Sequence, residues 1–221
     1  MKRFRETVTA ELILETYKKR RPAVRSRLKE FRRVRAEASD ERVWEEMVYC
    51  FFTGGCSAKM GLRSVDAVRP LLLSGTRDEI ARALSGVHRY PNARSRYVVE
   101  SRDFIRRHLD FRISEKLEKF DCPLERRDWL VQEPGIKGLG YKEASHFLRN
   151  VGFSGYAILD KHILGCLKDL LGVIDDVKPP VSRSRYLRTE EKLKDLARTL
   201  SIGFDELDLV LWSVKTGEIL K

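Results

Sequence analysis

Apolar residues recur every three or four positions along almost the whole chain, which is the period of an amphipathic α-helix. Asp40 precedes one such run, which begins at Val43, and Thr76 precedes another, which begins at Ile80. Short polar side chains of this kind are preferred at helix N-caps, so both residues are predicted to start helices. A further helical run covers residues 94–107.

Turn-forming residues separate these runs. They occur at Thr53-Gly54-Gly55, Tyr90-Pro91-Asn92, Asp121-Cys122-Pro123 and Lys178-Pro179-Pro180. No Asn-Gly or Asp-Gly turn joins two alternating runs, and strands do not alternate with helices. The pattern contains no internal repeat and no low-complexity tract. The predicted fold class is therefore all-α.

Positive charge is concentrated at the N-terminal end. The 221 residues hold 44 Lys+Arg and 33 Asp+Glu, a net charge of +11, and residues 1–40 contribute 13 − 6 = +7 of it. Apolar residues at helical spacing run through the same 40 residues, so we expect a basic helical segment that packs on a core of residues 41–221. This excess favours a polyanion such as nucleic acid as the partner, although any single Lys or Arg more often only solvates a helix face.

The sequence does not favour a membrane-spanning protein, a secreted protein or a disulfide- or zinc-stabilised one. The longest uncharged stretch in the most apolar region runs from Met47 to Ala58, which is too short to span a bilayer. The basic start at Met1 has no apolar stretch behind it, so a secretory signal is not expected. The four cysteines form no Cys-x-x-Cys pair, and four reduced thiols in a cytosolic protein are the simplest interpretation.

Two glycines bracket one apolar residue in the segment from Glu133 to Ala144. Gly138 and Gly140 permit a tight turn, and the helix predicted to follow would place exposed backbone N–H groups where they can hold a phosphate. A plain connection between two helices would explain the same glycines, so this signal is weak when taken alone.

Lys142 and Asp160 follow this turn. Lys142 lies in the first turn of the downstream helix, where the helix dipole disfavours a cation. Asp160 ends an apolar run at the N-cap of the next helix. A short loop, residues 152–156, could bring the two together. Taken singly, a surface lysine and a simple N-cap are the more common interpretations.

Taken together, these residues resemble a family. Gly138-Leu139-Gly140-Tyr141-Lys142 with the later Asp160 is similar to the helix-hairpin-helix signature of base-excision DNA glycosylases. The strings Tyr141 to Gly152 and Ala157 to Leu164 resemble the archaeal-type 8-oxoguanine DNA glycosylase/AP lyase family more closely. Further matches are Arg89 to Arg94, Ser57-Ala58-Lys59 and the ending Trp212 to Lys221. The resemblance covers most of the chain from about Glu41.

The resemblance implies a fold and a function. The fold would be a helix-hairpin-helix glycosylase of two helical subdomains with the active-site cleft between them, and the hairpin would lie at about 134–151. The activity would be removal of 8-oxoguanine from double-stranded DNA, followed by β-elimination at the abasic site. The resemblance implies no cofactor and no metal ion. We expect a monomer that works without a membrane, in the cytoplasm at the nucleoid of an archaeal or bacterial cell.

The resemblance also assigns roles to residues. Lys142 would attack the sugar C1′ of a nucleotide turned out of the helix, and Asp160 would move a proton or stabilise positive charge. Trp212 would stack on the flipped purine, and the terminal carboxylate of Lys221 would accept its hydrogen bonds. Gly138 and Gly140 would hold a DNA phosphate. For Trp212 and Lys221 the common alternatives are a core tryptophan and a frayed chain end.

One position departs from the family. Where members usually carry an amide side chain, before Ser57, this chain has Thr53-Gly54-Gly55-Cys56, so no preference for the opposite base is predicted. Three alternatives remain. A non-catalytic helix-hairpin-helix DNA-binding module would need the glycines but not Lys142. A glycosylase of the same superfamily could take a different damaged base. The endonuclease III branch is disfavoured because only Cys166 follows the hairpin, and its cluster needs four cysteines.

Overall fold

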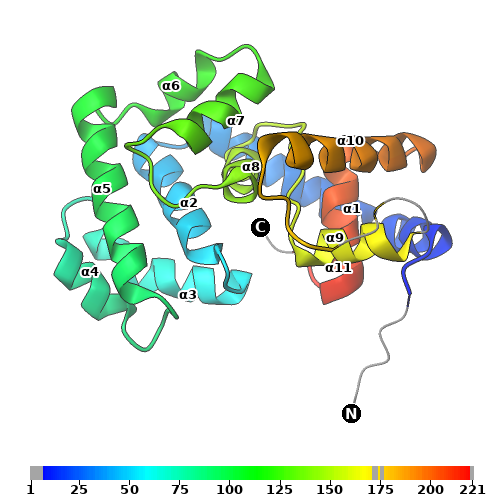
Figure 1. The fold of residues 1–221 in the computed structure, drawn as a ribbon, viewed down its shortest axis with the longest axis horizontal. Coiled ribbons are helices and arrows are strands. Elements are labelled where there is room, and N and C mark those ends of the chain that lie inside the picture. Colours follow the sequence, from blue (N-terminus) through cyan, green and yellow to red (C-terminus); the bar gives the residue numbers. More distant parts are fainter. Residues whose placement is uncertain (1–6, 171–173, 175–176, 220–221) are drawn as a thin grey trace. The chain divides into compact units, whose positions relative to one another are not determined.

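The computed structural model describes residues 7–170, 174 and 177–219 (Figure 1). Within these residues all regular elements are helical and no strand occurs, which confirms the predicted fold class. The chain forms two compact units. Unit 1 combines residues 1–30 with residues 154–221, and unit 2 contains residues 31–153.

The described helices follow one another along the chain. They are α1 (Ala10–Glu37), α2 (Asp40–Thr53), α3 (Ala58–Val68), the 3-10 helix η1 (Arg69–Leu71), α4 (Arg77–Leu84), α5 (Pro91–Leu109), α6 (Ile113–Glu118), α7 (Pro123–Gln132), α8 (Tyr141–Asn150), α9 (Lys161–Asp169), α10 (Arg183–Thr199) and α11 (Phe204–Thr216). The run expected at 94–107 is the interior of α5.

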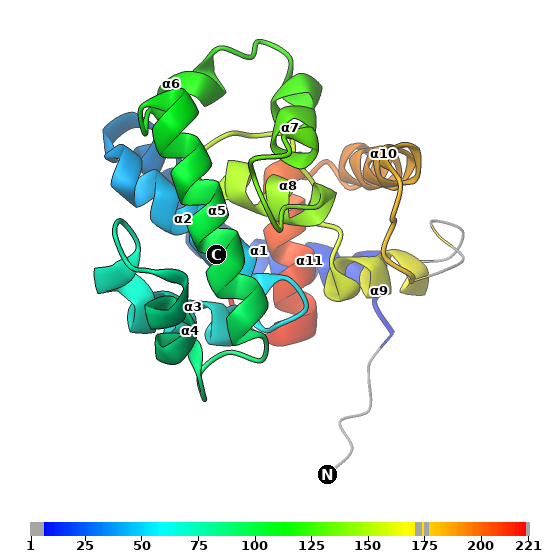
Figure 2. The same cartoon turned by 60° about the vertical axis from the view of Figure 1, so that its left-hand side comes forward.

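Unit 2 is built around α2. Almost every residue of this helix after Val43 is buried, and Trp44, Met47 and Phe51 are fully so. Helices α3 and α8 pack against α2, while α4 lies along α5 (Figures 1 and 2). The indole nitrogen of Trp44 donates to the carbonyl oxygen of Leu72 at 3.2 Å, which satisfies its one polar atom inside the core.

The two predicted N-caps differ in outcome. Thr76 caps α4 in a full capping box with Glu79, as expected. The prediction for Asp40 is wrong, because the N-cap of α2 is Ser39, whose hydroxyl accepts from the backbone N–H of Arg42. The Asp40 carboxylate instead accepts from the N–H and the hydroxyl of Ser114, at 2.7 and 2.8 Å.

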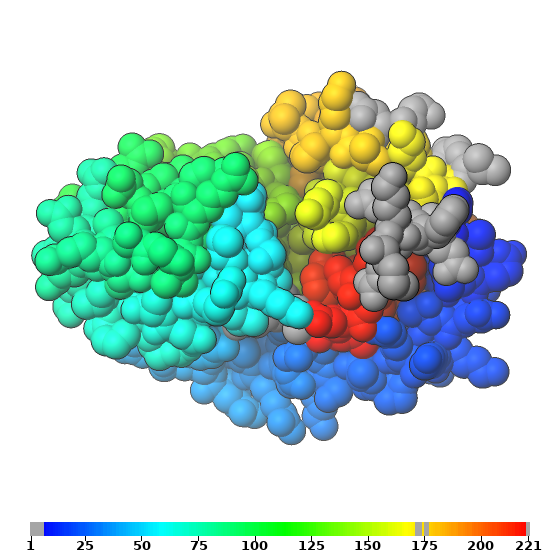
Figure 3. Space-filling view, turned by 90° about the horizontal axis from the view of Figure 1, so that it is seen from below, coloured from blue at the N-terminus to red at the C-terminus, as the bar shows by residue number. Residues whose placement is uncertain are grey.

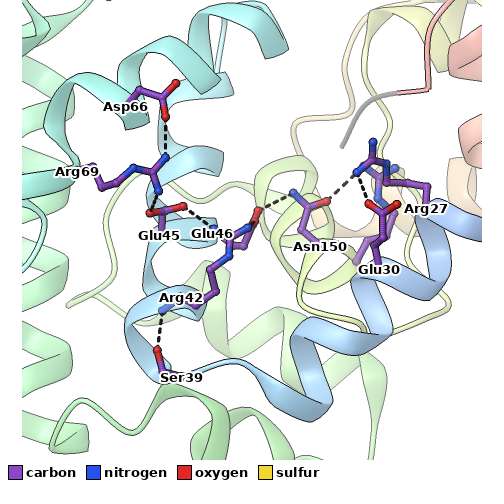
Figure 4. Close-up of polar contacts among 10 residues, drawn as sticks. Arg27, Glu30, Ser39, Arg42, Glu45, Glu46, Asp66, Arg69 and Asn150 are labelled. Carbon is purple, nitrogen blue, oxygen red and sulfur yellow. Dashed lines mark hydrogen bonds and ion pairs between the residues drawn. The ribbon is translucent and has the colours of Figure 1, made fainter.

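Buried charge ties α2 to α8 inside unit 2 (Figure 4). Glu46 is 2% exposed, pairs with Arg42 at 2.5 Å and accepts a hydrogen bond from the side-chain amide of Asn150 at 3.2 Å. A buried carboxylate is costly unless it is paired and hydrogen-bonded, and Glu46 has both kinds of partner. Asn150, at the end of α8, is thereby fixed on the central helix.

Unit 1 contains the first part of α1 with α9, α10 and α11. The last of these packs against both α9 and α10, and Figure 3 shows atoms of α11 and α9 side by side on the surface. Glu206 of α11 joins α1 by accepting from the Tyr17 hydroxyl and by pairing with Arg25, each at 2.6 Å. The basic segment is therefore an ordered helix within the described residues.

Helix α1 contributes residues to both units. Unit 1 ends its first segment at Glu30, inside the single helix α1, whereas the basic segment was expected to run to residue 40. The boundary at residue 40 and the cleft between two subdomains stay predictions. None of the described helices is both long enough and apolar enough to cross a membrane.

Candidate active site

The glycine segment forms the expected helical hairpin in unit 2. Helix α7 ends at Gln132, α8 begins at Tyr141, and the residues between them make the turn. Gly138 has a φ of +77°, a conformation that L side chains rarely adopt, and a Cβ there would lie 2.4 Å from the ring of Tyr97. Glycine is therefore required at this position both by the backbone and by the packing.

One face of α5 supports the turn. Tyr97, Ser101 and Phe104 lie at positions i, i+4 and i+7, which share a helix face. The hydroxyl of Ser101 accepts from the backbone N–H of Lys137 at 2.8 Å, and a Cβ on Gly135 would lie 1.9 Å from the ring of Phe104. Sequence reasoning missed this support, because the residues of α5 read as an ordinary amphipathic helix.

Backbone donors remain available at the tip of the hairpin. The N–H groups of Gly138 and Gly140 make no hydrogen bond within the described part of the chain. Gly140 is the N-cap of α8, has no side chain to cap the helix and is exposed. Free N–H groups at a helix N-terminus attract anions, and a phosphate is an anion of suitable size.

Lys142 is the second residue of α8, in the first turn as predicted. Its Nζ atom lies 2.9 Å from Oε1 of Glu143, and the two side chains are 25% and 17% exposed. The amine is thus partly shielded from water and still reachable. An amine with this exposure, two residues after the unpaired N–H of Gly140, can act as a nucleophile on a substrate whose phosphate those donors hold.

Helix α7 fixes the start of α8. The hydroxyl of Tyr141 donates to Asp128 at 3.1 Å, and Arg127, which is fully buried, donates to the hydroxyl of Ser145 at 3.1 Å. From Ala144 onward every residue of α8 is buried. The first turn of the helix, which carries the amine, therefore projects from a rigid base.

The turn that departs from the family lies against the same helix start. Arg94 donates a hydrogen bond to the carbonyl oxygen of Gly54. A Cβ on Gly54 would lie 3.1 Å from Nη2 of Arg94 and 3.5 Å from Oε1 of Glu143. Gly55 has a φ of +73° and open space where a side chain would begin. Neither Gly54 nor Gly55 therefore places a side chain at the tip of this turn, where the resemblance implies an amide.

Asp160 is the N-cap of α9, as predicted. Its Oδ1 atom accepts from the backbone N–H groups of His162 and Ile163, at 2.8 and 2.9 Å. Within the described part of the chain, Oδ2 accepts no hydrogen bond. One oxygen thus orients the carboxylate while the other remains available for a proton or for a developing positive charge.

Buried acidic side chains hold the segment that leads to Asp160. The N–H groups of Ala157 and Ile158 donate to Glu190 and Asp208, at 3.0 and 3.1 Å, and both carboxylates are about 98–99% shielded. An extended segment without a neighbouring strand needs such acceptors for its buried backbone. Sequence reasoning missed them, although carboxylates on inward helix faces are a signal that could have been used.

Trp212 of α11 lies beside the helix that Asp160 caps. Its ring centroid is 6.1 Å from that of His162, with 77° between the planes, and the indole is only partly buried. His162 therefore packs against the residue assigned to base stacking. All three residues belong to unit 1, and His162 contacts both the predicted acid, through its backbone N–H, and the predicted stacking residue, through its ring.

The structure describes the C-terminal part of the chain as far as Ile219, so Lys221 lies outside the described residues. Arg20 donates to the carbonyl oxygen of Gly217 at 2.8 Å, and Lys215 pairs with Asp169 at 2.6 Å. These contacts fix the end of α11 within unit 1. Lys142 belongs to unit 2, so its meeting with the residues of unit 1 stays a prediction.

The four cysteines are reduced thiols, as expected. All four are free of disulfide bonds, and burial raises the pKa of Cys166 to about 12, which keeps that thiol protonated. Across the described residues no three His, Cys, Asp or Glu side chains gather in a way that could hold a metal ion. His146 packs its ring against Tyr49, with 5.5 Å between the centroids.

The chain is similar to known proteins over most of its length. The family model described as 8-oxoguanine DNA glycosylase matches residues 24–202. The 8-oxoguanine DNA glycosylase/AP lyase of Korarchaeum cryptofilum is 39% identical over 202 residues, 91% of each chain. The protein of that name from Methanocaldococcus jannaschii is 35% identical over 196 residues, 88% of this chain and 90% of that one.

Two solved structures have the same fold. The 8-oxoguanine DNA glycosylase of Thermotoga maritima superposes with a TM-score of 0.86 at 32% identity, over 96% of this chain and 98% of that one. The Methanocaldococcus jannaschii 8-oxoguanine glycosylase/lyase, in complex with a 15mer DNA containing 8-oxoguanine, gives 0.87 at 33% identity, over 96% and 99%. The hairpin, α8 and α9 fall inside residues 24–202 of the family match, and α11 with Trp212 follows it.

Proposed function

The chain belongs to the 8-oxoguanine DNA glycosylase family, and on that premise we propose that it excises 8-oxoguanine from DNA through Lys142 and then cleaves the strand at the abasic site. The observation that carries the assignment is the position of Lys142, a partly shielded amine in the first turn of α8, directly after the glycine turn. The protein is a bifunctional base-excision-repair enzyme, a glycosylase and an AP lyase.

The reaction begins with the nucleotide turned out of the duplex, because a stacked base cannot be attacked. The lone pair of a neutral Lys142 amine forms a bond to the sugar C1′, while the bond from C1′ to the purine breaks and its electron pair leaves with the base. Loss of a proton from the amine and opening of the sugar ring give a Schiff base. Abstraction of a C2′ proton then expels the 3′ phosphate, and the strand is cut.

Asp160 supports this chemistry through its Oδ2 atom. The atom accepts no hydrogen bond within the described part of the chain, while Oδ1 fixes the carboxylate to the start of α9. A carboxylate held in this way can take the amine proton or stabilise positive charge on the sugar. Either role requires Asp160 to stand near Lys142 in the complex with DNA.

Recognition of the base is assigned to Trp212 and to the carboxylate of Lys221. The partly buried indole of Trp212 offers a flat surface for a purine, and a terminal carboxylate suits the N–H edge of guanine. The N–H groups of Gly138 and Gly140 would hold a phosphate of the same strand. These assignments rest on the family motif and on the local geometry of each unit.

The partner is DNA. One relative is known in complex with DNA that contains 8-oxoguanine, and curated relatives with the same name come from both archaea and bacteria. We extend the proposal to a monomer that acts at the nucleoid, in the cytoplasm of an archaeal or bacterial cell. The alternative of a non-catalytic DNA-binding module gains no support from the relatives, which are named as enzymes.

Borohydride trapping tests the nucleophile. A duplex with one 8-oxoguanine is incubated with the protein and reduced, which converts a Schiff base into a stable covalent adduct. The wild-type protein should form the adduct, and Lys142→Gln should bind the duplex without forming it. If Lys142→Gln gave a normal yield of adduct, another amine would be the nucleophile and the assignment would be wrong.

A further inference from the structure

Glu143 occupies a helix position that normally serves capping, yet its carboxylate is used differently. A glutamate at the third position of a helix commonly accepts from the backbone N–H of the N-cap residue. Glu79 does this in α4, where it accepts from the N–H and the hydroxyl of Thr76, both at 2.8 Å. Glu143 is the third residue of α8, but within the described residues it accepts no backbone N–H, and its ionic partner is Lys142.

The pair is unusual for residues that are adjacent in a helix. Consecutive side chains point about 100° apart and do not face each other. The 2.9 Å contact nevertheless forms, and the carboxylate of Glu143 lies near the N-terminal end of α8. Two glycines leave space for this carboxylate. A Cβ on Gly140 would lie 3.3 Å from Oε2 of Glu143, and a Cβ on Gly54 would lie 3.5 Å from Oε1.

The Gly54 turn is itself restrained. Arg94 donates to the carbonyl oxygen of Gly54, and its guanidinium lies over the rings of Tyr90 and Tyr97, at 5.7 and 5.2 Å from their centroids. The carboxylate of Glu143 therefore lies beside a turn that α5 holds in place. All of these contacts lie within unit 2.

We propose that Glu143 is the positioning residue for Lys142, and that its carboxylate holds the amine at the glycine turn in the orientation needed for attack on the sugar. The inference rests on the proposed role of Lys142 as nucleophile. A lysine side chain otherwise samples many rotamers, and only an orientation that points Nζ at C1′ is reactive. At 2.9 Å the carboxylate can orient Nζ in both protonation states: it pairs with the ammonium before attack, and it accepts a hydrogen bond from the neutral amine, whose lone pair is then free to point at C1′.

Glu143→Gln tests the proposal, because it keeps the shape of the side chain and removes the charge. Trapping on a duplex with a preformed abasic site is measured in single turnover at saturating protein. The rate should fall about 10- to 100-fold, the size expected for a misplaced reacting group. The dissociation constant for the same duplex and the thermal midpoint should stay within experimental scatter of wild type. Glu143→Asp, which keeps the charge, should recover part of the rate.

Glu79→Gln is the matched control, since it removes the same charge from the same helix position in α4, and its trapping rate should equal that of wild type. A wild-type rate for Glu143→Gln would overturn the positioning role. So would a parallel loss of rate, affinity and thermal midpoint, which would indicate a structural role. In both cases the proposed function stands if Lys142→Gln forms no adduct. Normal trapping by Lys142→Gln would remove the nucleophile, and with it both proposals.

Discussion

The imidazole of His162 meets the indole of Trp212 nearly edge to face, with 6.1 Å between the ring centroids and 77° between the planes. Such a geometry is favourable for two aromatic rings and fixes the tilt of the indole. His162 is also the residue whose backbone N–H donates to Asp160. The start of α9 therefore connects the carboxylate assigned to chemistry with the ring assigned to base stacking.

Trp212→Ala should slow excision of 8-oxoguanine and spare cleavage at a preformed abasic site. Stacking of a base on an aromatic side chain contributes about 1–3 kcal/mol, so the excision rate should fall roughly 5- to 150-fold. The lyase step involves no base and should stay close to wild type. Trp212→Phe, which keeps an aromatic face, should retain most of the excision rate. Equal loss of both activities in the alanine variant would point to unfolding instead.

Asp160→Asn should keep the fold and the binding of DNA while slowing chemistry. The cap uses only Oδ1, and the amide oxygen of asparagine can accept the same two N–H groups of His162 and Ile163. What changes is the other atom, which becomes an NH₂ group and can no longer take a proton. Single-turnover excision should fall at least tenfold with an unchanged thermal midpoint. Unchanged single-turnover kinetics would remove Asp160 from the mechanism.

Gly138→Ala should destabilise the protein more than Gly86→Ala. Both glycines have φ near +75°, so alanine at either position carries the same backbone strain of about 1–2 kcal/mol. A Cβ at Gly86 meets nothing within 4 Å, whereas one at Gly138 would lie 2.4 Å from the ring of Tyr97. Urea denaturation of the two variants separates strain from steric overlap. Equal losses would show that the ring of Tyr97 moves aside at little cost.

His88 should make stability depend on pH. It is 4% exposed, its Nε2 donates to the carbonyl oxygen of Phe52 at 3.0 Å, and its Nδ1 accepts from the N–H of Tyr90 at 2.9 Å. Burial lowers the pKa of His88 below 6.5; the hydrogen bond to Phe52 opposes this effect, and the charge of Arg94 adds to it. The unfolded chain therefore binds a proton more readily than the folded one.

The sign of the effect follows from that difference. The contribution of His88 is fully present above a pH of about 6.5, the ordinary histidine value, and is lost as the pH falls toward the lower pKa of the folded state. Urea denaturation at pH 7.5 and 5.5 should show less loss on acidification for His88→Gln than for wild type. His108→Gln, which changes an exposed histidine, should behave as wild type does.

The fold class, the hairpin and the helix positions of Lys142 and Asp160 could be predicted from the sequence, because each depends on local rules of periodicity, glycine and capping. Contacts between residues distant in the chain could not. Nothing near Glu143 in sequence indicates that Gly54 lies beside its carboxylate, and the acceptors of the backbone before Asp160 come from two later helices. The prediction for Asp40 failed for the same reason. Its carboxylate accepts from Ser114, a residue distant in sequence, and Ser39 is the N-cap of α2 instead.

Contacts within unit 1 anchor the end of α11, and they bear on the prediction for Lys221. Gly217 ends α11 with a φ of +80°, and its carbonyl oxygen accepts from Arg20. Lys215, two residues earlier, pairs with Asp169. Helix α11 is therefore anchored at its end, and we expect the role proposed for the terminal carboxylate to depend on chain length more than on the last side chain.

Deleting Lys221, or extending the chain with a C-terminal tag, should slow excision of 8-oxoguanine, whereas Lys221→Arg should not. Deletion or extension displaces the carboxylate, and the arginine variant leaves it in place. Losing one charged hydrogen bond costs roughly 1.5–3 kcal/mol, about one to two decades in rate. Cleavage at a preformed abasic site should be spared, because that step needs Lys142 and no base. Comparing the two activities in the deletion variant decides between base recognition and general misfolding: a selective loss identifies the carboxylate as a reader of the base, equal losses indicate misfolding, and no loss makes Lys221 an ordinary chain end.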